Sequence, residues 1–376
     1  MRFGNAWCYR HILASKGFIR SLWHSRRNLA AYDRTGRPRS GPYMAELDIT
    51  YRCNCRCHMC QRWRDERRGE LAASDYARLA AEFADIGVHQ ISIAGGEPLM
   101  REDVFEIIAH HAGRGLSVNL CTNGIRVERH CREILDSGAR CVTVSLDGAL
   151  AETHDAIRGA PGSYAQIRRG VDALLAQRRG RRPIVRVRMT VSGLNAGEVR
   201  RFYEQWHGVA DDVLFQPAHH CGHSYYTGLD AGSINPDAGL LAAQIEGTPL
   251  ARDGYMRRWV EGLGTRRFPP RAPCYAGYLM ARIDPWGGVY PCLEQHACVG
   301  SVRSERFAQV WGSAEFQRER ARLASDRPCA CWYNNTAMIG HFGSRLKALC
   351  APAAIRAAAQ APPGGDLAPT LPGKAP

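Results

Sequence analysis

Between residues 44 and 216 the sequence alternates strand-like and helix-like segments, and this alternation limits the chain to very few folds. Apolar or alternating runs predict strands at 45–50, 90–94, 117–121, 141–146, 185–191 and 213–216. Helical spacing and capping residues predict helices at 74–86, 102–114, 127–137, 164–177 and 196–207. Strands that alternate with helices require a parallel sheet, either doubly wound or curled into a partial barrel. Ligands of such sheets bind at the carboxyl ends of the strands.

A cluster of cysteines directly follows the first predicted strand. Cys53, Cys57 and Cys60 have the spacing C-x3-C-x2-C, and thiolates at this spacing can bind three corners of an iron–sulfur cube. The remaining iron can then accept a substrate or cofactor, just as catalytic zinc sites keep one position open. We expect the nearby Cys55 to point away from such a cluster. A structural zinc loop, with His58 or Cys55 as the fourth ligand, is the alternative.

Three further motifs lie where predicted strands end, on the same rim as the cysteine loop. They are Gly95-Gly96-Glu97-Pro98, Thr122-Asn123-Gly124 and Ser145-Leu146-Asp147-Gly148. Paired glycines let the backbone approach a ligand closely, and a carboxylate can receive a cationic amine. Together with the cysteine triplet, this set resembles the radical S-adenosylmethionine (radical SAM) superfamily over residues 43–217.

The resemblance implies an α/β fold, a partial (β/α)6 barrel, in which Cys53, Cys57 and Cys60 hold a [4Fe–4S] cluster. The open iron would chelate the methionyl amine and carboxylate of S-adenosylmethionine (SAM). The implied cofactor-binding residues are Gly95, Gly96 and Glu97 at the amine, Ser145 at the ribose or carboxylate, Asn123 on the rim, Arg158 near the carboxylate, and Gln216 with Pro217 beside adenine. A surface position is the alternative for Arg158. Met59 replaces the family's usual aromatic residue, and its polarisable side chain can substitute for one.

A second group of cysteines lies near the end of the chain. Cys274 and Cys292 flank a predicted hairpin with strands at 279–284 and 289–292, and a helix at 305–323 precedes Cys329 and Cys331. Four such thiolates can complete a cluster. The arrangement resembles the small α+β SPASM/twitch extension of radical SAM enzymes, and it implies one auxiliary [4Fe–4S] cluster. The closing C-x-C departs from the usual C-x2-C, so Cys298 is a reserve ligand, and a zinc ribbon is the alternative.

The remaining segments differ in composition from this core. We expect a basic, helical N-terminal segment at 1–40, the radical SAM core at 41–220, a linker or substrate-side segment at 221–270, the auxiliary domain at 271–350, and a disordered Ala/Pro-rich tail at 351–376. The N-terminal helix could pack on the core, which we favour, or lie on a membrane surface.

Two sets of histidines and cysteines fall outside the motifs. His219, His220, Cys221 and His223 follow the sixth strand, where they could bind metal or shuttle protons, although ordinary surface histidines are the simpler interpretation. Cys121, Cys131 and Cys141 lie in predicted strands or helices and are expected to be buried apolar residues.

The charge and the cysteine count bear on partners and compartment. The formal charge of +14 comes from scattered arginines, which a GC-rich coding bias explains, so we expect no nucleic-acid binding. No apolar run approaches the roughly 20 residues that span a bilayer. Lys16 and Arg20 interrupt the apolar stretch at 11–23, so we expect no secretory signal. Fifteen cysteines, an odd number, favour metal ligation in a cytoplasmic protein over a disulfide scaffold.

These features lead to one functional hypothesis. The chain resembles an enzyme that cleaves SAM to a 5′-deoxyadenosyl radical and abstracts hydrogen from a peptide or small-molecule substrate, in peptide, protein or natural-product maturation. Such an enzyme needs an electron donor such as flavodoxin or ferredoxin. A non-catalytic iron–sulfur or zinc protein and an RNA-modifying radical SAM enzyme are the alternatives.

Overall fold

Parallel strands form the centre of the molecule. The computed structural model describes residues 18–34, 36–218, 231–265, 274–293 and 297–325 of the 376. Within these residues an eight-stranded sheet has the order β6-β5-β4-β3-β2-β1-β7-β8. The strands are β1 (Met44–Thr50), β2 (Gln90–Gly95), β3 (Ser117–Thr122), β4 (Cys141–Ser145), β5 (Ile184–Val191), β6 (Asp212–Pro217), β7 (Met280–Ile283) and β8 (Val289–Tyr290). Every neighbouring pair is parallel except β7 and β8.

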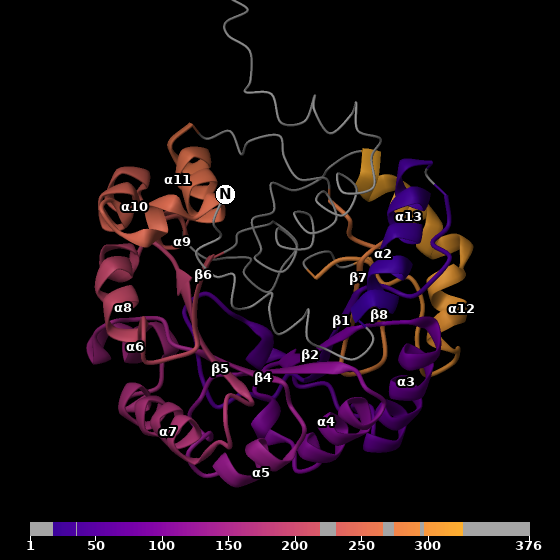
Figure 1. Cartoon of the computed structure of the whole chain (residues 1–376), viewed down its shortest axis with the longest axis horizontal. Helices are drawn as coiled ribbons and strands as arrows, with labels where there is room; N and C mark the ends of the chain where they lie inside the picture. The colour runs from indigo at the N-terminus through magenta and orange to yellow at the C-terminus, as the bar shows by residue number, and fades with distance from the viewer. Residues whose placement is uncertain (1–17, 35, 219–230, 266–273, 294–296, 326–376) are drawn as a thin grey trace, which may run out of the picture.

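The sheet curls, and helices cover its outer side (Figure 1). These outer helices are α3 (Ala73–Ile86), α4 (Val104–Gly113), α5 (Cys131–Asp136), α6 (Ala151–Arg158), α7 (Ser163–Gln177) and α8 (Val199–Trp206). The partial-barrel prediction is therefore confirmed, and the six predicted core strands agree with the structure to within two residues at either end. Helix α6 was not predicted, because only His154 and Ile157 of its eight residues are buried and its sequence carries no apolar stripe.

The two faces of the sheet differ in polarity. Along β1, Ala45, Leu47 and Ile49 belong to the hydrophobic core that packs against the outer helices. The alternate residues Glu46 and Asp48 are polar and point to the other side, toward the barrel interior. The same alternation in β3, β4 and β5 directs polar side chains inward. The apolar core thus lies between sheet and helices, while the barrel interior is polar.

The range 221–270, expected to be a linker or substrate-side segment without a clear period, is helical where the structure describes it. It contains α9 (Ala231–Ile234), α10 (Ala238–Ile245), a 3-10 turn (Pro249–Arg252) and α11 (Gly254–Thr265). Arg200 of α8 donates to the carbonyl oxygens of Ala243 (2.9 Å) and Glu246 (2.6 Å), which fastens the end of α10 to the barrel. Sequence analysis placed no helix here, and α9 and α10 have only four and eight residues. The role of the range as a linker or substrate-side segment stays a prediction.

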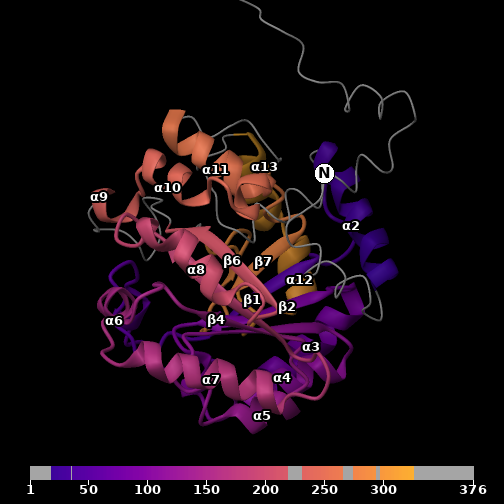
Figure 2. The same ribbon diagram turned by 60° about the vertical axis from the view of Figure 1, so that its left-hand side comes forward.

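The predicted C-terminal hairpin forms, but it extends the barrel sheet instead of making a separate one. β7 pairs in parallel with β1, from Met44↔Met280 to Leu47↔Ile283, and β8 pairs antiparallel with β7. The single helix predicted at 305–323 is two helices, α12 (Phe307–Gly312) and α13 (Ala314–Ser325). Figure 1 places α12 and α13 on the side of the barrel where β7 and β8 lie, and in Figure 2 α12 again lies beside β7.

The N-terminal helix α2 (Phe18–Asp33) packs on the core, as favoured from the sequence. Its Asn28 amide donates to the carbonyl oxygens of Ser40 (3.2 Å), Gly41 (2.9 Å) and Tyr278 (3.0 Å), and Leu29 joins a second buried cluster with Tyr275 and Tyr278. Among the described residues, no helix is long and apolar enough to cross a membrane.

Candidate active site: three thiols on the rim of the barrel

The cysteine loop leaves the carboxyl end of β1 and is held in place by the end of α6. The backbone amides of Arg56 and His58 donate to the carbonyl oxygens of Arg158 (2.9 Å) and Ile157 (2.8 Å). The Cys60 amide donates to the Cys57 carbonyl at 3.1 Å, which closes a turn between the second and third cysteines. Helix α6, which sequence analysis missed, therefore positions the thiols.

Cys55 lies among the other thiols, so the expectation that it points away is wrong. Its side chain hydrogen-bonds to the sulfurs of Cys53 and Cys57. The Cys55 backbone amide also donates to Cys53 Sγ at 3.4 Å. The hydrogen bond from Cys55 lowers the pKa of Cys53 and lowers that of Cys57 to about 6. Burial raises the pKa of Cys60 to about 11.

Two rim residues direct N–H groups at the cysteine sulfurs. The Asn123 amide nitrogen lies 3.9 Å from Cys53 Sγ, and Arg158 Nη1 lies 3.7 Å from Cys57 Sγ. Arg158 also pairs with Asp147, Nη2 to Oδ2 at 2.8 Å, and its side chain is only 11% exposed. The alternative of a surface position for Arg158 is therefore wrong.

The glycine pair after β2 fits against the start of the cysteine loop. A Cβ on Gly95, where φ is +127°, would lie 2.2 Å from the Thr50 carbonyl oxygen, and one on Gly96 would lie 2.4 Å from that of Arg52. The amides of Gly96 and Glu97 donate to these same two oxygens at 2.7 and 2.9 Å. Only glycine lets the two strand ends meet so closely.

The Glu97 side chain joins the ends of β2 and β3. Its fully buried carboxylate accepts hydrogen bonds from the Thr122 hydroxyl (2.7 Å) and from the amides of Asn123 (2.6 Å) and Leu99 (3.0 Å). Burial raises the pKa of Glu97 despite these donors. The carboxylate thus stabilises the rim, while the expected contact of residues 95–97 with the methionine amine stays a prediction.

Ser145 and Gln216 lie at the ends of β4 and β6, as predicted, with β5 between the two strands. The Ser145 hydroxyl accepts a hydrogen bond from Arg188 Nη2 at 3.1 Å, and the Gln216 amide donates to the Thr190 hydroxyl at 3.5 Å. Sequence analysis did not single out Arg188. The available signal was a charged residue at inward positions of the alternating run 184–191.

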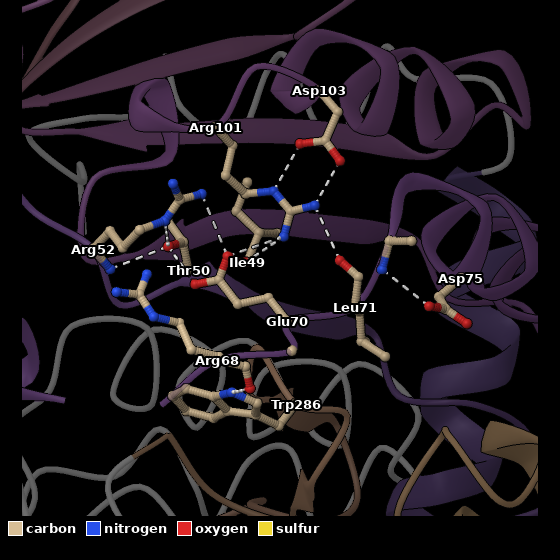
Figure 3. A network of polar contacts seen from close by, with 12 residues as sticks. Ile49, Thr50, Arg52, Arg68, Glu70, Leu71, Asp75, Arg101, Asp103 and Trp286 are labelled. Atoms are coloured by element: carbon tan, nitrogen blue, oxygen red, sulfur yellow. Dashed lines mark hydrogen bonds and ion pairs between the residues drawn. The ribbon is translucent and has the colours of Figure 1, made fainter. Parts of the chain in front are cut away.

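The segment after the third cysteine is fixed to β1 by a polar network (Figure 3). The Arg101 guanidinium donates to the carbonyl oxygens of Ile49 (2.8 Å) and Leu71 (3.0 Å) and to the Asp103 carboxylate. The Thr50 hydroxyl donates to Glu70 at 2.6 Å. A cleft of about 540 Å³ lies over this network, lined in part by Arg52 and Met100. Arg101 was not singled out from sequence either, although it lies three residues after the Gly95-Gly96-Glu97-Pro98 motif.

The C-terminal hairpin is also tied to the cysteine loop region. Trp286 lies in the turn between β7 and β8, and its indole N–H donates to the Arg68 carbonyl oxygen at 3.0 Å (Figure 3). Arg62 and Arg282 approach the two oxygens of the fully buried Asp48, at 3.2 and 3.5 Å. These contacts connect the hairpin to the segment that follows the cysteine loop, so a shift of the hairpin would displace that segment.

Of the predicted auxiliary ligands, the structure describes Cys274 and Cys292. Cys292 is buried, and Cys274 is half-buried and packs against the same second cluster. Cys329 and Cys331 lie outside the described residues, and so do His219, His220, Cys221 and His223. The reserve ligand Cys298 is exposed, and its thiol donates to the Gly300 carbonyl at 3.3 Å.

Among the three cysteines expected to be inert, two are buried as predicted. Cys131 is 4% and Cys141 9% exposed. Cys121 is only partly buried and faces the barrel interior, where its sulfur accepts from the Asn119 amide at 3.1 Å and lies 3.5 Å from the Ser92 hydroxyl. The expectation of an apolar burial was therefore wrong for Cys121.

The donor set on the rim suits an iron–sulfur cluster. The rim offers thiols on one loop, with N–H groups of Asn123 and Arg158 aimed at two of the sulfurs. Thiolate ligands with hydrogen bonds to sulfur are what such clusters require.

Two family models match the chain. The radical SAM superfamily matches residues 47–205, and an iron–sulfur cluster-binding domain, SPASM, matches residues 274–332. An AdoMet-dependent heme synthase of Nitratidesulfovibrio vulgaris is 34% identical over 305 residues, which cover 72% of this chain and 79% of the relative. The mycofactocin maturase MftC of Mycobacterium ulcerans is 27% identical over 328 residues, 81% of each chain.

Solved structures share the fold. Streptococcus suis SuiB bound to S-adenosylmethionine superposes with a TM-score of 0.58 at 16% identity, over 82% of this chain and 74% of SuiB. SuiB bound to its precursor peptide SuiA gives the same TM-score over 78% of this chain and 69% of SuiB. The chain therefore belongs to the radical SAM superfamily and is an enzyme whose cofactors are SAM, a [4Fe–4S] cluster and an auxiliary iron–sulfur cluster in a SPASM domain.

Proposed function

We propose that this enzyme applies radical SAM chemistry to a peptide, or to another polar natural-product intermediate, bound in the barrel. The observation that carries the substrate class is the polar interior of the sheet. There Arg186 pairs with Asp212 at 2.6 Å, and the Thr143 hydroxyl donates to Asn119 at 2.9 Å. A ligand on this face must replace hydrogen bonds, which peptide amides can do and an apolar ligand cannot.

The cluster ligands in this proposal are the cysteines expected from the sequence. Cys53, Cys57 and Cys60 would hold the [4Fe–4S] cluster, and Cys274, Cys292, Cys329 and Cys331 would hold the auxiliary one. With SAM bound and one electron added, the first cluster supplies a 5′-deoxyadenosyl radical. An external electron donor such as flavodoxin or ferredoxin would deliver that electron.

The chain's own rim residues would bind and orient the cofactor. Asn123 and Arg158 direct N–H groups at the sulfurs of Cys53 and Cys57, which stabilises the thiolate form. Gly95, Gly96 and Glu97 would present backbone to the methionine amine, since the Glu97 carboxylate is committed to Thr122 and Asn123. The remaining contacts would come from Ser145, Arg158 and Gln216.

A structure with the same fold supports a peptide as the substrate, because SuiB has been captured with the precursor peptide SuiA. A relative in sequence, MftC, is a mycofactocin maturase, which supports a role in maturation.

The test uses short peptides encoded beside the gene. The reconstituted enzyme is incubated without oxygen with SAM, a reductant and each peptide, uniformly deuterated. We expect deuterium in 5′-deoxyadenosine and a matching mass change in one peptide. Formation of 5′-deoxyadenosine with no deuterium from any peptide, and deuterium instead from a non-peptide metabolite pool, would overturn the peptide assignment.

A further inference from the structure

We propose that the arginine-rich surface around Trp63 is the docking site for an acidic one-electron carrier. The inference rests on the proposed function, because only a cluster that must be reduced in each cycle needs such a partner. We call residues 56, 63, 64, 67 and 68 the entry patch. One electron leaves the reduced carrier and arrives at the oxidised cluster, and no bond or proton changes place in that step.

Trp63 links the surface to the third cysteine of the site. Its indole N–H donates to the Cys60 carbonyl oxygen at 2.9 Å, and the residue is only partly buried. The guanidinium groups of Arg56 and Arg64 lie 4.7 and 5.1 Å from its ring centroid. An aromatic ring hydrogen-bonded to the peptide of a ligand cysteine offers an electron a short path of bonded contacts from solvent to sulfur.

Arg56 fastens the patch to the cysteine loop itself. Its Nη1 donates to the carbonyl oxygens of Cys53 (2.8 Å) and Cys55 (3.0 Å), while the side chain remains exposed. A partner that contacts Arg56 and Trp63 therefore lies against the loop that carries all three ligands. No other exposed aromatic side chain of the described residues is bonded to that loop.

The charge of the patch selects the partner. Arg56, Arg64, Arg67 and Arg68 are exposed, whereas the nearby acids are Glu66 and Asp65, and Asp65 is 16% exposed and paired with Arg67 at 2.7 Å. Arg303 is a further exposed cation. Its guanidinium donates to the carbonyl oxygens of Trp286 and Gly69, which holds it beside the entry patch. A surplus of one charge sign accelerates and orients encounters with a partner of the opposite sign, and salt weakens the effect.

The first experiment measures binding, independent of turnover. The affinity of reconstituted enzyme for flavodoxin, an acidic FMN protein, is measured by calorimetry in 50 and 300 mM NaCl. The double variant Arg64→Glu/Arg68→Glu leaves the Arg56 bonds to the cysteine loop intact. We expect it to weaken binding about tenfold or more in 50 mM NaCl, and much less in 300 mM NaCl.

The matched control carries the same charge change elsewhere. Arg132→Glu/Arg257→Glu alters side chains that are 83% and 61% exposed on α5 and α11, and it should bind flavodoxin like the parent. Equal losses in both double variants, or no loss in either, would overturn the proposal. If Arg64→Glu/Arg68→Glu loads less iron than the parent, Arg64→Gln/Arg68→Gln replaces it, with a smaller loss expected.

The second experiment separates docking from electron entry. Trp63→Leu should leave the flavodoxin dissociation constant unchanged but slow the bleaching of cluster absorbance by reduced flavodoxin, while dithionite still reduces the cluster at the parent rate. An equal rate with flavodoxin would contradict the role of Trp63. The alternative occupant is an acidic peptide. It would be supported if a poly-glutamate peptide bound the entry patch as tightly as flavodoxin does, and if the double variant did not change flavodoxin binding. Failure of the peptide-substrate test leaves all these readouts unaffected.

Discussion

Arg158 joins the cysteine loop to the end of β4: its Nη2 lies 2.8 Å from Asp147 Oδ2, while its Nη1 lies 3.7 Å from Cys57 Sγ. Burial by itself lowers the pKa of Arg158, but Asp147 and the neighbouring thiolates outweigh it and raise the pKa. The guanidinium is therefore charged, and the Asp147 carboxylate is the negative partner that compensates this buried positive charge.

Asp147→Asn should destabilise the protein strongly. It removes the carboxylate partner of a buried arginine but keeps an oxygen for the Thr190 amide, so the loss reports the ion pair. We expect the free energy of unfolding to fall by about 3 kcal/mol. Urea unfolding of the cluster-free protein measures it. The control Glu128→Gln breaks the exposed pair with Arg169 and should cost less than about 1 kcal/mol. Equal losses in the two variants would contradict this prediction.

Gly96→Ala should prevent cluster loading. A Cβ at this position would lie 2.4 Å from the Arg52 carbonyl oxygen and 2.6 Å from that of Tyr51, so the backbone that enters the cysteine loop must shift. After anaerobic reconstitution, the variant should contain about one [4Fe–4S] cluster fewer per chain than the parent, measured as bound iron and sulfide. Gly113→Ala, where a Cβ meets nothing within 4 Å, is the control and should load like the parent. Full loading of Gly96→Ala would show that the close approach is dispensable.

Cys55→Ala should raise the pKa of Cys57 without removing a cluster ligand. In cluster-free protein the Cys57 thiol titrates at about 6, chiefly because Cys55 donates to it, so it should react with iodoacetamide from about pH 6 upward. Loss of that donor should move the onset toward higher pH. Peptide-level mass spectrometry against pH measures the shift, and Cys131→Ala is the control. An unchanged profile for Cys57, or loss of iron in Cys55→Ala, would contradict the assignment.

Stability should fall as the pH drops below about 6.5. Burial lowers the pKa of His89 and His111 to about 4 and that of His154 to about 3. Since the unfolded chain binds these protons near its ordinary pKa of about 6.5, their full contribution is present above that pH and is lost as acid protonates the unfolded state. Each histidine should cost roughly 1 kcal/mol at pH 5.5. Urea unfolding from pH 8 to 5.5 tests this, and a flat profile would contradict it.

The sequence was most informative where a local pattern and the tertiary structure agree. The core strands and the rim motifs at Gly95–Glu97, Asn123 and Ser145 could be placed because parallel strands bring their carboxyl ends to one edge. Helix α6 and the helices within 231–265 could not, since short helices with few buried residues leave no apolar period. Because α6 was not predicted, the hydrogen bond from the Arg56 amide to the Arg158 carbonyl oxygen, which anchors the cysteine loop, could not be predicted either.

Side-chain direction was harder to predict than position. Cys55 was expected to point away, yet its side chain hydrogen-bonds to Cys53 and Cys57. Arg188 and Arg101 act through partners distant in sequence, Ser145 and the carbonyl oxygens of Ile49 and Leu71. Such pairings depend on strand register and on loop packing, which a single sequence does not specify.

The most direct measurement concerns the three ligands on the rim. Anaerobically reconstituted protein is reduced and examined by electron paramagnetic resonance with and without SAM, alongside a variant with alanine at Cys53, Cys57 and Cys60 and a Cys298→Ala control. The parent and the control should show a [4Fe–4S] signal that changes on adding SAM, and should release 5′-deoxyadenosine, while the triple variant should lack both. A triple variant whose SAM-sensitive signal persists would contradict the account.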